Sequence, residues 1–151
     1  MILKLFPIEP PQTQVQFALP GYQEFSCDAP DSATSKTPNY YELQGERIPC
    51  TEWAKMLQSV IERLHDYNGG IIELMARTNE KMDGCDYPLF SFDPGKVFNP
   101  IAIKGTSIYQ CRGFSAERII RIIRWLLDKY DIEHEDFIYS AKPTKSGKAG
   151  Q

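Results

Sequence analysis

Hydrophobic positions recur at the spacing of an α-helix in a stretch that follows Thr51. They fall at offsets of 0, 3, 4, 7, 8 and 11 and so share one stripe: Trp53, Met56, Leu57, Val60, Ile61 and Leu64. The spacing predicts a helix over about residues 52–65. Thr51 is its expected amino-terminal cap, and Asn68-Gly69-Gly70 is expected to end it.

A second helical pattern follows Ser115, a residue type that suits a helix amino terminus. Its stripe is wider than the first, because two further apolar positions flank it: Ile119, Ile122, Ile123, Leu126 and Tyr130, with Ile120 and Leu127. The pattern predicts a helix over about residues 115–130. For residues 71–77 we expect one or two helical turns.

Short strands are predicted around the glycine turns at Gly45 and Gly105. Further strands are expected at residues 15–19, at residues 87–92 as an edge strand, and at residues 137–139. Each glycine hairpin precedes one of the helices, which suggests two ββα units, although chance explains so common an arrangement equally well. The predicted fold class is α+β, with two main helices packed on one face of a small antiparallel sheet.

The expected organisation is an amino-terminal strand and mobile loop over residues 1–40, an α+β domain over 41–141 and a polar tail over 142–151. Hydrophobic residues make up 42% and charged residues 25%, which is ordinary for a globular protein. No apolar run reaches about 18 residues, and proline interrupts the first residues before a signal sequence forms. We therefore expect a cytoplasmic protein without a membrane segment.

The four cysteines, Cys27, Cys50, Cys85 and Cys111, lie far apart in the sequence, and the chain has only two histidines. No pair has zinc-ligand spacing, so we expect free thiols, no metal site and no cofactor. Two disulfides in a secreted protein remain the alternative.

Charge is distributed unevenly along the chain. Residues 1–100 carry 8 basic and 14 acidic side chains, which gives −6, and residues 101–151 carry 9 and 6, which gives +3. Between residues 104 and 124 the chain has a single acidic residue, Glu117, and five cationic residues: Lys104, Arg112, Arg118, Arg121 and Arg124. Guanidinium groups match phosphate oxygens, so this basic helix face is a candidate contact for nucleic acid.

The alternative for the arginines is a solvated helix face, in which Glu117 pairs with Arg121, or Arg124 with Asp128, at i,i+4. Trp125 is either partly buried in the core or placed to fill a partner's pocket. Tyr109, Phe114 and Tyr139 are expected to pack in the core rather than to stack on bases.

The sequence contains few combinations of residues that could support catalysis. His65 and His134 each neighbour carboxylates, as solvated histidines do, and pairing either with Cys50 or Cys111 as a thiol hydrolase is the least favoured hypothesis. The acidic cluster of Asp128, Asp131, Glu133, Glu135 and Asp136 lacks the glycine and oxygen pattern of a calcium loop. No catalytic residue is assigned, and an enzyme is not expected.

About half of the chain resembles uncharacterised bacterial α+β modules. The pattern is a strand around Gly105, a Ser115-Ala116 helix start, paired isoleucines and leucines, an acidic loop and a final aliphatic strand, with Leu43, Gly45 and Trp53 as a companion motif. The resemblance implies association with restriction, nuclease and other DNA-transaction proteins. The predicted function is a non-enzymatic binding module that contacts nucleic-acid phosphates; a protein-interaction or homodimerisation domain centred on Trp125 is the alternative.

Overall fold

The computed structural model describes residues 20–144. Its larger sheet has four antiparallel strands in the order β1-β7-β2-β3, namely β1 (Gln23–Ser26), β2 (Lys36–Leu43), β3 (Glu46–Pro49) and β7 (Phe137–Pro143). Among the strands of residues 20–144, the last therefore inserts between the first two, and the β2–β3 hairpin turns at Gln44-Gly45. Gly45 has a φ of +85°, the left-handed conformation that this turn requires.

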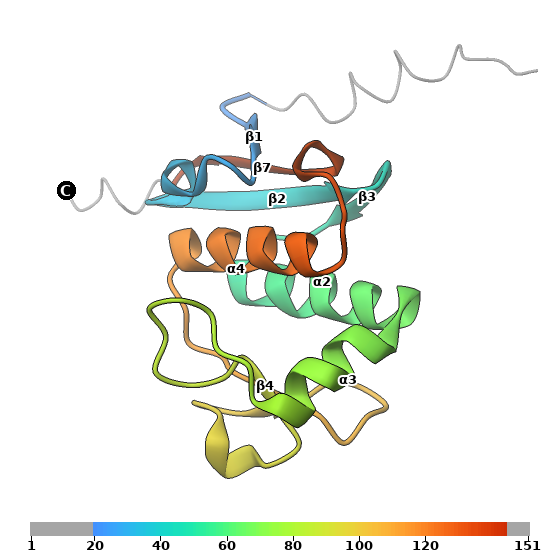
Figure 1. Ribbon diagram of the computed structural model, residues 1–151. Helices are drawn as coiled ribbons and strands as arrows, with labels where there is room; N and C mark the ends of the chain where they lie inside the picture. Colours follow the sequence, from blue (N-terminus) through green and yellow to red (C-terminus); the bar gives the residue numbers. More distant parts are fainter. Residues whose placement is uncertain (1–19, 145–151) are drawn as a thin grey trace, which may run out of the picture.

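Three helices lie on one side of this sheet: α2 (Trp53–Tyr67), α3 (Gly69–Thr78) and α4 (Ala116–Lys129). In Figure 1, α4 and α2 run side by side directly beneath the sheet, and α3 forms part of a third layer beneath them. Within residues 20–144, no helix has both the length and the apolar character to span a bilayer.

The third layer also contains a small antiparallel sheet in the order β4-β6-β5, built from β4 (Phe90–Ser91), β5 (Ile101–Ala102) and β6 (Tyr109–Gln110). Short 3-10 turns occupy the connections: η2 (Pro30–Ala33), η3 (Pro94–Lys96) and η4 (His134–Asp136). The large sheet lies on one side of the helical layer and the small sheet on the other. Helix α4 is therefore covered on two sides.

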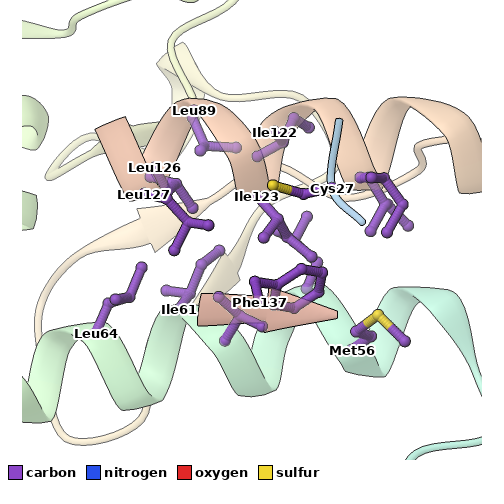
Figure 2. Packing of buried hydrophobic residues seen from close by; sticks show 14 of the residues in the cluster. Cys27, Met56, Ile61, Leu64, Leu89, Ile122, Ile123, Leu126, Leu127 and Phe137 are labelled. Atoms are coloured by element: carbon purple, nitrogen blue, oxygen red, sulfur yellow. The ribbon is translucent and has the colours of Figure 1, made fainter. Parts of the chain in front are cut away.

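This double cover explains the wide apolar stripe of α4. Its six aliphatic residues are at most 1% exposed: Ile119, Ile120, Ile122, Ile123, Leu126 and Leu127. Figure 2 shows Ile123 directed toward Phe137 of the large sheet, whereas Leu89 lies on the opposite side of α4, near Ile122. The arginines of α4 occupy what remains of its circumference.

The predicted α+β class is confirmed, and both main helices begin and end within two residues of their expected bounds. Ser115 caps α4 as predicted, since its Oγ accepts a 3.2 Å hydrogen bond from the Arg118 N–H. The predicted Thr51 cap is wrong: Glu52 occupies the cap position of α2 and forms no side-chain cap bond. Residues 71–77 do form helix, within α3.

The structure differs from the sequence expectation in three places. The segment expected as loop before residue 41 contains η2, with Pro30 and Ala33 buried, and β2 already begins at Lys36, so the boundary at 40 falls inside a strand. The hairpin around Gly105 pairs with β4 in a separate sheet, so the two ββα units do not share one sheet. Of the predicted edge strand only Phe90–Ser91 is strand, and residues 15–19 lie outside the described part.

Candidate functional site

An apolar groove of about 300 Å³ lies between α4 and the loop that connects α3 to β4. Large hydrophobic side chains supply most of its lining: Met82, Leu89, Phe98, Phe114, Ile122 and Trp125. No residue of β4, β5 or β6 lines the groove; its walls come from α4, from the loop before β4 and from the residues that flank β5 and β6. Concave apolar surface with a few polar groups is typical of a binding site.

Cys111 fixes the floor of the groove. Its Sγ lies 3.1 Å from the Pro88 carbonyl and accepts a 3.2 Å bond from the Phe98 N–H, and its backbone N–H donates to the Leu89 carbonyl at 3.0 Å. Through these three bonds, Cys111 connects the end of β6 to the loop before β4 and to the residues after η3. Burial raises the pKa of the Cys111 thiol, so this sulfur stays protonated and serves as a structural anchor.

Two exposed aromatic rings border the groove. Tyr87 and Phe98 are 49% and 53% exposed, and their ring centroids are 5.8 Å apart. Gly113 lies against Phe98 with a φ of +90°, and a Cβ there would lie 3.3 Å from Phe98 Cε2. Glycine therefore allows the ring to approach the backbone. Paired aromatics left in water beside an apolar hollow are a feature of partner-binding surfaces.

Arg118 supplies the cation of the groove. Its Nη1 lies 3.4 Å from the Cys85 sulfur, a weak acceptor, and in residues 20–144 no carboxylate comes within ion-pair distance of it. The guanidinium therefore keeps most of its donor capacity for another group. It stands beside the apolar wall, one helical turn from Ile122.

The other two arginines of the predicted phosphate contact have partners within the protein. Arg121 pairs with Glu117 at 2.8 Å, as the i,i+4 alternative predicted, and with Asp31 at 3.4 Å. Arg124 pairs with Asp28 at 3.6 Å rather than with Asp128. Three carboxylates thus pair with Arg121 and Arg124, whereas Arg118 has none within ion-pair distance in residues 20–144.

The remaining predicted cations do not join this row. Lys104 lies in the β5–β6 turn, whose neighbours Gly105 and Thr106 border His65 and Glu73. Arg112 donates to the backbone and side-chain oxygens of Asn99 at 3.2 Å each. The five cations that cluster in the sequence are therefore spread over different surfaces.

Trp125 is partly buried, which is the first of the two roles weighed from the sequence; its role in contacting a partner stays a prediction. It packs against the core, and it also lines the groove, with the Lys129 ammonium 5.3 Å from its ring centroid. The expectation that Tyr109, Phe114 and Tyr139 pack in the core is confirmed, since Tyr139 is fully buried and the other two pack against the hydrophobic cluster.

The described histidines do not form a catalytic pair with Cys50 or Cys111. His134 instead lies between two carboxylates, with Nδ1 2.8 Å from Asp28 and Nε2 2.7 Å from Asp128. The bond to Asp128, with a smaller contribution from Asp28, holds the pKa of the imidazole above its ordinary value. The neighbouring Cys27 is fully buried, and burial raises the pKa of its thiol to about 11, which makes it a poor nucleophile.

All four cysteines are free thiols, as predicted. Comparison of the chain with protein-family models, with curated proteins and with solved structures found no match. The resemblance to restriction-associated modules consequently stays a prediction, and the groove has to be interpreted from its own chemistry.

Sequence reasoning placed Trp125 and Arg118 at the site but missed the opposite wall. Met82, Leu89 and Phe98 lie in irregular segments without hydrophobic periodicity, so no pattern connects them with α4. The one available signal was the density of aromatic residues between 87 and 98, a segment for which only an edge strand over residues 87–92 was predicted.

Proposed function

We propose that this protein is a protein-interaction domain whose groove takes an apolar side chain of a partner, while Arg118 binds a carboxylate next to that side chain. The observation that carries the proposal is the combination of the Trp125-lined hollow, the exposed Tyr87–Phe98 pair and a guanidinium without a carboxylate partner in residues 20–144. Such a surface suits an acidic segment that presents one aromatic or large aliphatic residue.

Charge favours this function over binding of a polyanion. Nucleic-acid contacts need cations in excess, because affinity comes from neutralised phosphates. The carboxylates of Glu117, Asp31 and Asp28 pair with Arg121 and Arg124, so Arg118 is the one arginine of α4 without a carboxylate partner in residues 20–144, and the chain as a whole carries −3. Phosphate binding through the arginine row stays a prediction and is one outcome of the test below.

The proposal is tested by selecting a random peptide library against the immobilised protein. Peptides with an aromatic or large aliphatic residue beside Asp or Glu should be enriched. Arg118→Gln should weaken binding of the selected peptide by about 10- to 150-fold, which corresponds to the loss of one hydrogen bond between charged groups. The matched control is Arg77→Gln, since Arg77 is an exposed helical arginine on α3, away from the groove.

A second variant tests the apolar half of the groove. Cys85→Trp places a bulky side chain on the groove lining and should prevent peptide binding, whereas Cys50→Ser, at a half-buried cysteine elsewhere, should not. Selected peptides without an acidic residue, or binding unchanged by both Arg118→Gln and Cys85→Trp, would refute the proposal.

Nucleic acid is tested with the same preparation. Affinity for duplex DNA that falls steeply with added salt, and that Arg121→Glu with Arg124→Glu abolishes, would replace protein interaction by phosphate binding as the function. Because Arg118 remains in that double variant, peptide binding should survive the change.

A further inference from the structure

A second cluster of chemically active side chains lies at the other end of α4. Cys27 and Asp28 follow β1, and His134 begins η4, more than 100 residues later in the sequence. The pairing of β1 with β7 brings these two connections together. One ligand atom from each of the three residues lies within 4.8 Å of the other two.

We propose that Cys27 Sγ, Asp28 Oδ1 and His134 Nδ1 form a binding site for a divalent transition-metal ion of the Zn²⁺ type. Thiolate, imidazole and carboxylate together are the donor set of zinc, whereas Mg²⁺ and Ca²⁺ prefer oxygen alone. Ligand atoms around a tetrahedral zinc ion stand roughly 3.3 to 3.7 Å apart. Binding therefore requires the Cys27 sulfur to approach the other two atoms by up to about 1.5 Å, and Asp28 Oδ1 and His134 Nδ1, now 2.8 Å apart, to separate by about 0.5 Å.

Asp128 holds the imidazole of His134 in the orientation that a metal ion needs. Its Oδ1 lies 2.7 Å from Nε2, so Nε2 keeps its proton when a metal ion replaces the proton on Nδ1, the nitrogen that faces Asp28 at 2.8 Å. A carboxylate bound to the far nitrogen of a histidine is the usual outer partner of a histidine that ligates zinc. Here that partner comes from the last turn of α4, a third segment of the chain.

The surroundings leave room for a fourth ligand. A polar cavity of about 350 Å³ adjoins His134, and its carboxylates come from Asp28, Asp128, Asp131, Glu133 and Glu135. The Cys27 sulfur is fully buried, and Asp28 is the exposed member of the set, so the ion would lie between the core and this cavity. Water from the cavity completes four-coordination.

Among the ligands and the groups that contact them, the charges of the metal-bound site balance; the other carboxylates of the cavity, Asp131, Glu133 and Glu135, are exposed. The ion and Arg124, whose Nη1 is 3.6 Å from Asp28, carry three positive charges against the Cys27 thiolate, Asp28 and Asp128. Without metal, a proton on His134 and a proton on Cys27 replace the two positive charges of the ion, so the charges still balance. Binding therefore releases these two protons to solvent, as expected when thiol and imidazole become ligands.

The test uses Co²⁺ as a spectroscopic probe, added to the untagged full-length chain after removal of metals with EDTA. The expected result is one equivalent bound, with a near-ultraviolet thiolate-to-cobalt charge-transfer band and the intense visible bands of tetrahedral cobalt. Zn²⁺ should displace the cobalt and raise the Tm, whereas Mg²⁺ should do neither.

Variants assign the ligands. Cys27→Ser should remove the charge-transfer band, His134→Gln should abolish binding, and Asp128→Asn should lower affinity by about 10- to 100-fold while leaving the band in place. The matched controls are Cys50→Ser and His65→Gln, which change the same residue types outside the cluster.

Two results would overturn the site. One is the absence of stoichiometric Co²⁺ or Zn²⁺ binding to the wild-type chain; the other is binding that His134→Gln and Cys27→Ser leave unchanged. Since Cys27 is buried, circular dichroism checks that Cys27→Ser folds. If it does not, His134→Gln and Asp128→Asn, at exposed or half-exposed positions, decide the question.

Discussion

The orientation of α4 decides which of its residues face the groove and which face water, and Ile123→Ala tests that orientation. Ile123 is fully buried and points toward Phe137, on the side of α4 that meets the large sheet. Truncation to alanine removes three carbon atoms from a position that α4, α2 and the sheet enclose.

The expected cost follows from this complete burial. Ile→Ala in a closed core costs about 2 to 5 kcal/mol, and Ile→Val about 0.5 to 1.5 kcal/mol. A domain of this size is stable by about 5 to 15 kcal/mol, so Ile123→Ala removes a large share of the stability. The Tm should fall by roughly 10 °C, with a smaller fall for Ile123→Val.

Urea unfolding followed by circular dichroism measures the effect, with an unchanged m-value showing that the folded state is preserved. The control is Leu74→Ala on α3, because Leu74 is 56% exposed and its truncation should change stability by at most about 0.5 kcal/mol. A loss below about 1 kcal/mol at Ile123 would show that this face of α4 is not buried. The outward placement of the arginines would then be wrong as well.

Three further predictions concern the same scaffold. Ser115→Ala should destabilise the protein by about 1 kcal/mol in urea, because the cap bond to Arg118 N–H is lost, and Ser115→Asp should retain that stability. Arg121→Gln should cost less than about 1 kcal/mol, and the difference from wild type should shrink further in high salt, since its ion pairs are solvent-exposed. Burial raises the pKa of Tyr130 and Tyr139 to about 12, against about 10 in an unfolded chain, so stability should be full below about pH 10 and fall as the pH rises toward 12; titration of all eight tyrosines near pH 10 in the folded protein, followed by tyrosinate absorbance, would contradict this.

The elements with strong periodicity were predictable from the sequence. The stripes of α2 and α4 have helical spacing and are buried, and Gly45 marked the β2–β3 hairpin. The sequence also showed that the α4 stripe is wider than the α2 stripe, although it did not predict the second layer that covers this helix.

Long-range placement was not predictable. Nothing in the sequence indicates that β7 inserts between β1 and β2, yet this topology brings Cys27 beside His134. Spacing rules for metal sites apply to ligands that are close in sequence, so the expectation of no metal site could not account for a cluster assembled by strand pairing. Likewise, the sequence counted the cations around Arg121, but Asp28 and Asp31 reach α4 only through the fold.

The most direct test of the groove as a partner-binding site is the fluorescence of Trp125 in a Trp53→Phe chain, where it is the only tryptophan. Addition of a selected acidic, aromatic peptide should shift the emission to shorter wavelength and saturate at one equivalent, and Arg118→Gln should move the midpoint to higher peptide concentration. Emission that stays unchanged while the peptide binds would place the contact elsewhere and contradict the proposed function.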